Sequence, residues 1–152
     1  MNHDKIPQAL KQLDRWVVWG VDTGKPKMPF NPTSMTPAKA GDPSTWDCFE
    51  TAWGRVVNGQ AQGVGFEFHN DGYYGIDLDH VLDERGSLSP EATEIVKLLN
   101  SYTEISPSGT GLHIIVKAGG IKLEANRKGF IEIYNQGRYF TMTGNIYEGA
   151  GI

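Results

Sequence analysis

Cysteine is almost absent from this sequence, because Cys48 is the only one among 152 residues. A single cysteine cannot form an intramolecular disulfide or a cysteine-rich zinc site, so the fold depends on neither. No apolar run approaches the roughly 18 residues that a membrane-spanning helix needs. The first 12 residues also lack the apolar centre of a signal peptide. We therefore expect a protein of the cytoplasm without a membrane partner.

The sequence also lacks the surplus of basic residues that is typical of nucleic-acid-binding domains. It has 14 Lys+Arg against 18 Asp+Glu, which gives a net charge of -4. The charges are unevenly placed, since residues 67–104 carry nine acidic and two basic side chains, and residues 105–138 carry five basic and two acidic ones. An acidic stretch is most simply a solvated surface, so the residues inside it must decide whether it has a function.

The remaining composition is that of a folded domain. Hydrophobic residues make up 39% and charged residues 21% of the chain, which excludes a disordered tail, a collagen or a coiled coil. A chain of 152 residues fits a single compact core. We therefore expect one domain over residues 1–152.

Hydrophobic patterning predicts an α+β fold with a mostly antiparallel sheet. Helical spacing is found over 4–13, 44–58 and 90–100, and strand patterns over 15–21, 63–68, 73–81, 103–106, 112–118, 129–134 and 138–144. Asp71 and Gly72 suit a tight turn, so 63–68 and 73–81 are predicted to form a β-hairpin. Residues 25–43 hold five prolines and form a loop or arm. The tryptophans at 16, 19, 46 and 53 are expected in the core rather than as base-stacking surfaces.

Three acidic residues on two predicted strands are candidate metal ligands. Asp77 and Asp79 are two residues apart, so both project from one face of their strand. Two adjacent carboxylates repel each other and are costly to hold without a cation. Glu132 stands between two isoleucines on another strand, and the three carboxylates converge if these strands are neighbours. Three hard oxygen ligands suit Mg²⁺ or Mn²⁺, although each residue could also belong to a solvent-facing polar surface.

Two turns farther along the chain offer groups that could bind phosphate. Ser106 and Ser108 lie in a small-residue loop that runs directly into a strand, and such loops can present hydroxyl and backbone N–H groups to phosphate oxygens. His113 lies on that strand, where a lone histidine could equally be structural. Arg138 follows a second tight turn, from which it could hold a phosphate through two parallel hydrogen bonds.

In their order and spacing, these segments resemble the catalytic motifs of the archaeo-eukaryotic primase superfamily. The motifs are I-D-L-D-H-V-L-D at 76–83, S-Y-T-E-I-S-P-S-G at 101–109 with L-H at 112–113, and E-I-Y-N-Q-G-R-Y-F-T-M-T-G at 132–144. W-V-V-W at 16–19, K-M-P-F-N-P at 27–32 and G-V-G-F at 63–66 extend the likeness to the primase-polymerase domains of phages and plasmids. The resemblance runs from about residue 10 to residue 146.

The resemblance implies a small N-terminal α/β module packed on an RNA-recognition-motif-like, mostly antiparallel sheet, with the site in the cleft between them. It implies DNA primase and polymerase activity, in which nucleotides are transferred from nucleoside triphosphates on a single-stranded DNA template. The expected location is the cytoplasm of a bacterial host cell. Asp77, Asp79 and Glu132 would be the catalytic residues and would hold Mg²⁺ or Mn²⁺ by a two-metal mechanism. The nucleotide-binding residues would be Ser106, Ser108, His113 and Arg138.

Family members usually continue into a helical region and often a helicase domain, whereas this sequence ends soon after the third motif. We therefore expect metal and nucleotide binding with weak or distributive polymerisation, and a helicase domain or protein as a partner. Lys25, Lys27 and Lys39 on the proline-rich arm are candidates for DNA phosphate contacts, or are solvated loop charges. Two other functions stay open: a non-catalytic binder of single-stranded nucleic acid, and a metal-dependent nuclease or nucleotide hydrolase.

Overall fold

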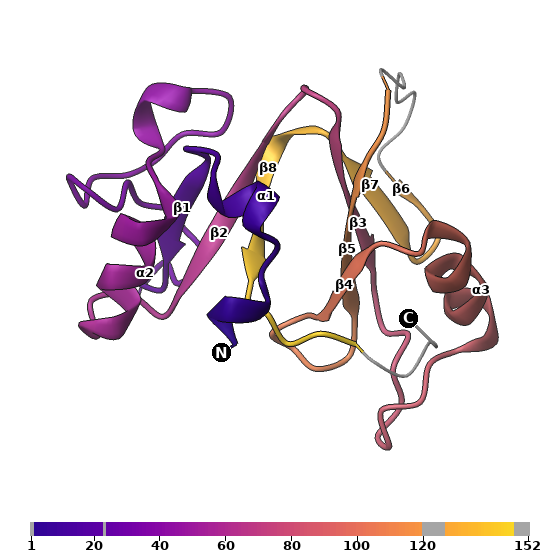
Figure 1. Ribbon diagram of the computed structural model, residues 1–152. Coiled ribbons are helices and arrows are strands. Elements are labelled where there is room, and N and C mark those ends of the chain that lie inside the picture. The colour runs from indigo at the N-terminus through magenta and orange to yellow at the C-terminus, as the bar shows by residue number, and fades with distance from the viewer. Residues whose placement is uncertain (1, 23, 120–126, 148–152) are drawn as a thin grey trace.

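The chain folds into two antiparallel sheets (Figure 1). The computed structural model describes residues 2–22, 24–119 and 127–147. The strands are β1 (Trp16–Trp19), β2 (Gly63–His69), β3 (Tyr73–Leu78), β4 (Tyr102–Ile105), β5 (Leu112–Lys117), β6 (Arg127–Lys128), β7 (Ile131–Tyr134) and β8 (Gln136–Met142). One sheet has the order β1-β2-β8, and the other has the order β4-β5-β3-β7-β6. This confirms the predicted α+β class and the small N-terminal module on an antiparallel sheet.

The helices are η1 (His3–Lys5), α1 (Gln8–Lys11), η2 (Pro43–Thr45), α2 (Phe49–Val57) and α3 (Pro90–Leu99). α2 lies beside the three-stranded sheet and α3 covers the outer side of the five-stranded sheet, whereas α1 lies in front of the space between the sheets (Figure 1). α3 begins and ends as predicted, because the Ser89 hydroxyl accepts a hydrogen bond from the N–H of Ala92 and Asn100 closes the helix in a left-handed conformation. No helix in the described ranges is both long and apolar enough to cross a membrane.

Two predicted helices are shorter than expected. The helix predicted over 4–13 is divided by Pro7, whose extended backbone separates η1 from α1. The helix predicted to begin at Ser44 begins at Phe49 instead. The Asp42 side chain accepts from the N–H of Ser44 and caps the short η2, after which Trp46 is extended. The aspartate cap at Asp42 therefore starts a separate helical turn rather than the long helix.

The predicted hairpin of β2 and β3 is wrong. β2 pairs with β1 and β8, whereas β3 pairs with β5 and β7, so the two strands belong to different sheets. Asn70 and Gly72 have φ angles of 53° and 99°, and this turn leads the chain from one sheet to the other. β8, predicted in the second half of the fold, returns to complete the N-terminal sheet. Turn residues identify such a turn but do not specify which strands pair across it.

Two hydrophobic cores hold the layers together. One lies between the two sheets and α2, and the other lies between the five-stranded sheet and α3. Gly75 on β3 permits the close approach of the sheets, because a Cβ there would be 2.4 Å from Cζ of Phe68 and 2.6 Å from Cε2 of Phe140. Ile76 and Leu78 face α3, so the alternating residue Asp77 faces the space between the sheets.

Candidate active site

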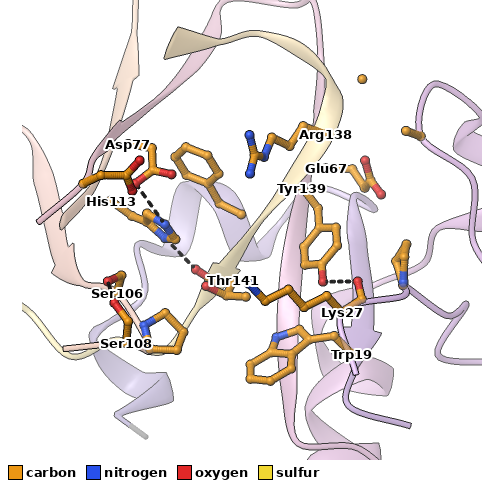
Figure 2. A pocket seen from close by; sticks show the side chains of 16 residues that line it. Trp19, Lys27, Glu67, Asp77, Ser106, Ser108, His113, Arg138, Tyr139 and Thr141 are labelled. Atoms are coloured by element: carbon orange, nitrogen blue, oxygen red, sulfur yellow. Dashed lines mark hydrogen bonds and ion pairs between the residues drawn. The ribbon is translucent and has the colours of Figure 1, made fainter. Parts of the chain in front are cut away.

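A cleft of about 750 Å³ lies between the two sheets (Figure 2). Strands of both sheets, the loop before β5 and the proline-rich arm all contribute to its lining. Lys25 and Lys39 are exposed and are not among the described residues that line it. The structure therefore distinguishes Lys27, which lines the cleft, from the other two lysines of the arm. The predicted residues that do line the cleft are Lys27, Asp77, Asp79, Ser106, Ser108, His113 and Arg138.

The register of three strands places three predicted residues in one row. Asp77 on the central strand β3 is directly opposite His113 on β5 and directly opposite Glu132 on β7. Residues that pair directly across antiparallel strands project from the same face, with Cβ atoms about 4.5–5.5 Å apart. The strands of Asp77 and Glu132 are thus the neighbours that the convergence of the carboxylates required.

The carboxylates in this row repel one another. The pKa of Asp77 is raised to about 6, first by burial and then by the negative charges of Asp79 and Glu132. Three carboxylates that repel one another fit a hard divalent cation, because its positive charge would offset their repulsion. Among the described residues, however, no group of three His, Cys, Asp or Glu side chains is already arranged around a metal position. Part of the reason is that protein partners engage Glu132.

Glu132 is buried and contacts two protein groups. Nη1 of Arg138 lies 3.1 Å from its Oε2, and the hydroxyl of Tyr134 donates a hydrogen bond of 2.5 Å to the same oxygen. The Arg138 guanidinium also lies over the Tyr134 ring, 4.3 Å from its centre. A cation bound through Oε2 would compete with both contacts, and a phosphate bound to Nη1 of Arg138 would have to break this ion pair.

His113 is fixed on three sides. Its ring stacks on Phe140, with centroids 4.4 Å apart and an interplanar angle of 20°. Nδ1 lies 3.4 Å from the carbonyl oxygen of Thr141, and Nε2 lies 3.7 Å from Oδ1 of Asp77. Burial lowers the pKa of His113 to about 4, so the imidazole is neutral at pH 7. Because a carbonyl only accepts, Nδ1 carries the proton in this contact.

The loop of residues 106–111 is fastened to the end of β3. The N–H groups of Val81 and Leu82 both donate to the carbonyl of Thr110. A Cβ at Gly111 would be 2.7 Å from the carbonyl oxygen of Leu78, so only glycine allows this approach. The N–H groups of residues 109–111 donate within the loop, two of them to serine hydroxyls. We therefore expect hydroxyl groups rather than these amides to meet a phosphate.

Comparison with known proteins agrees with the geometry. No family model matches the chain. Over 150 residues the chain is 37% identical to a DNA primase-polymerase of Nitratiruptor phage NrS-1. The chain is homologous to part of a phage DNA primase-polymerase. The alignment covers 93% of this chain but 21% of that protein, so the chain spans about a fifth of the length of the relative.

Two residues that the three-stranded sheet contributes to the cleft lining, Trp19 and Glu67, were not predicted there. Trp16 and Trp46 are buried as expected, but Trp19 is half-buried and lines the cleft. Glu67 also lines it and is fully buried, and burial raises its pKa to about 7 against the attraction of Arg15. The G-V-G-F-E pattern was a usable signal, because two alternating glycines leave one strand face bare beside an acidic residue.

Proposed function

We propose that this chain is the catalytic domain of a phage-type DNA primase-polymerase. It would transfer nucleotides from nucleoside triphosphates to a primer end on a single-stranded DNA template. The observation that carries the proposal is the row of His113, Asp77 and Glu132 across three neighbouring strands, in which His113 and Asp77 line the cleft and Glu132 is buried beside them. The similarity to a phage DNA primase-polymerase over most of the chain supports it. A cleft of about 750 Å³ is also of a size that accepts a nucleotide.

Asp77, Asp79 and Glu132 would hold Mg²⁺ or Mn²⁺. When bound, two such ions activate an attacking hydroxyl and offset the charge that develops on the reacting phosphate. The contribution of the protein is a rigid sheet that keeps carboxylates close together in a buried place, where their mutual repulsion favours a cation. The strand backbones fix the positions of Asp77 and Glu132, so binding would require side chains to rearrange, with Glu132 giving up contacts to Arg138 or Tyr134.

Ser106, Ser108 and Arg138 would contact the triphosphate. The serine hydroxyls lie 3.0 Å apart at the mouth of their loop, beside Asp79 in the cleft lining. Arg138 would exchange Glu132 for a phosphate, and this exchange would remove one of the two protein contacts that Oε2 of Glu132 makes. Nucleotide binding would thus help to complete the carboxylate site.

His113 and Lys27 would position the reactants. His113 lies between Asp77 and the strand β8 and would meet the triphosphate from the floor of the cleft. Lys27 is the arm lysine that lines the cleft, so it is the first choice for a DNA phosphate contact. Contacts by Lys25 and Lys39, and a helicase domain or protein acting with this chain, stay predictions.

A primer-extension assay tests the proposal. The wild type is given a labelled primer on a longer template, deoxy- or ribonucleoside triphosphates, and Mg²⁺ or Mn²⁺. We expect extension with release of pyrophosphate. The double variant Asp77→Ala, Asp79→Ala should not extend, whereas Glu94→Gln on the exposed side of α3 should extend like the wild type.

Other outcomes identify the alternative functions. Release of mononucleotides from DNA, or of inorganic phosphate from a triphosphate, would indicate a nuclease or a nucleotide hydrolase. DNA binding without any response to metal or triphosphate would indicate a non-catalytic binder. Full extension by the double variant would overturn the assignment of the carboxylates.

A further inference from the structure

The cleft extends past the edge strand β8 to the face of the three-stranded sheet that points away from His113, and this face carries two aromatic rings that lie across strand β2. A Cβ at Gly63 would be 2.5 Å from Cζ2 of Trp19, and a Cβ at Gly65 would be 2.4 Å from Cδ2 of Tyr139. Each ring therefore occupies the space that a side chain would fill on any residue other than glycine. We call Trp19 and Tyr139 the aromatic shelf.

Hydrogen bonds to the backbone hold the aromatic shelf in place. Nε1 of Trp19 donates to the carbonyl of Val64 at 2.9 Å, and the Tyr139 hydroxyl donates to the carbonyl of Lys27 at 2.6 Å. Both rings are half-buried and both line the cleft. Because their polar atoms are engaged by the protein, the surface that the shelf offers a ligand is mainly apolar ring.

Two polar groups on the same sheet face lack hydrogen-bond partners. Glu67 pairs directly with Tyr139, and Thr141 pairs directly with Gly65, so all project from the face that carries the shelf. Both carboxylate oxygens of Glu67 and the hydroxyl of Thr141 are buried and have no hydrogen-bond partner among the described residues. Buried polar groups in proteins are normally satisfied. A ligand on the shelf with an N–H group on its edge would satisfy the hydroxyl of Thr141.

We propose that the aromatic shelf is a nucleobase-binding subsite, in which one base stacks on Trp19 and turns its polar edge toward Thr141. A planar aromatic ligand with N–H donors matches both the rings and the unpartnered hydroxyl of Thr141. Base stacking on an aromatic side chain contributes about 1–3 kcal/mol. Figure 2 shows Trp19 and Tyr139 on one side of the pocket, with Asp77, His113 and Ser106 on the other. A nucleotide would thus place its base and its phosphates on the two sides of the edge strand β8.

The choice of a nucleobase rests on the proposed function, and the base can come from two sources. It belongs either to the incoming nucleotide or to the DNA strand. Both sources present the same chemistry to the shelf, so ligands with and without a base can separate them.

The test measures dissociation constants of four probes in the presence of Mg²⁺. The probes are dATP, inorganic tripolyphosphate, a short single-stranded oligonucleotide, and an abasic strand of equal length. Trp19→Leu removes the ring but keeps an apolar side chain, and Trp19→Phe keeps a smaller ring. Trp53→Leu is the matched control, because Trp53 lies on α2 and stacks on His3 outside the cleft lining. Thermal unfolding of each variant checks that the fold is kept.

We expect Trp19→Leu to weaken binding of a base-bearing probe about tenfold or more, with tripolyphosphate and the abasic strand unchanged. Trp19→Phe should restore part of the loss, and Trp53→Leu should bind all probes like the wild type. A loss confined to dATP assigns the base to the incoming nucleotide, and a loss confined to the oligonucleotide assigns it to the DNA. Wild-type affinity of Trp19→Leu for both base-bearing probes would overturn the proposal. So would an equal loss for base-bearing and base-free probes.

The subsite and the proposed reaction can fail separately. Binding is measured without turnover, so base-dependent binding by a protein that never extends a primer would remove only the polymerase assignment. Primer extension by the wild type, combined with normal binding by Trp19→Leu, would remove only the subsite.

Discussion

The two walls of the cleft are both antiparallel sheet, but they present opposite chemistry. On the five-stranded wall, alternation sets Asp77 between Ile76 and Leu78, so acidic side chains gather on one face. On the three-stranded wall, alternation sets Gly63 and Gly65 opposite buried aromatic residues, and rings from neighbouring strands fill the bare face. One wall carries electrostatic repulsion and the other carries unpartnered polar groups. A single backbone pattern thus supports two chemistries, each at a cost to stability.

The largest expected effect separates the function of the acidic wall from its stability. Asp77→Asn keeps the size of the side chain but removes a charge that burial and two nearby carboxylates disfavour. We expect primer extension to fall on the order of 10³-fold, while the melting temperature rises by about 3 °C. Glu94→Gln, on the exposed side of α3, should change neither primer extension nor the melting temperature. A folded Asp77→Asn protein with a lower melting temperature would show that the wall is not under electrostatic strain.

The next effect concerns the glycines under the aromatic shelf. Gly65→Ala places a Cβ 2.4 Å from the Tyr139 ring, so the ring or the strand must shift. We expect a loss of about 1–3 kcal/mol in the free energy of unfolding, measured by urea denaturation. Gly54→Ala is the control, because a Cβ there meets no described atom within 4 Å and α2 favours alanine over glycine. Equal stabilities of the two variants would show that Tyr139 does not need the space above Gly65.

The smallest effect is a pH dependence from Glu67. Its folded-state pKa of about 7 exceeds the ordinary 4.5, because burial favours the neutral form. The stability that this carboxyl contributes is therefore complete below about pH 4.5 and is lost as the pH rises to about 7. Glu67→Gln lacks this titration, so it should be more stable relative to the wild type at pH 8 than at pH 5, by on the order of 1 kcal/mol. Parallel stability curves for the two proteins would contradict the raised pKa.

Much of the fold could be predicted from local pattern. Ser89 and Pro90 mark the start of α3, and the strands that carry Asp77, His113 and Glu132 all occur where alternation or β-branched residues indicate them. The residue types of the acidic wall, and the strand faces of Asp77 and Glu132, also follow from spacing alone, whereas Asp79 lies in the turn after β3 rather than on the predicted strand. These features depend on neighbours within a few residues along the chain, so the sequence contains them directly.

The pairing of the strands and the contacts of individual side chains could not be predicted from local pattern. β2 and β3 are adjacent in sequence, yet each finds its partners elsewhere, and β8 joins a sheet that begins more than a hundred residues earlier. Arg138, a predicted phosphate contact, lines the cleft and also pairs with Glu132, and Trp19 was predicted in the core but lines the cleft. The sequence by itself determined which side chains each face carries. Only the tertiary structure decided which faces meet, because that choice depends on long-range packing rather than on local backbone preference.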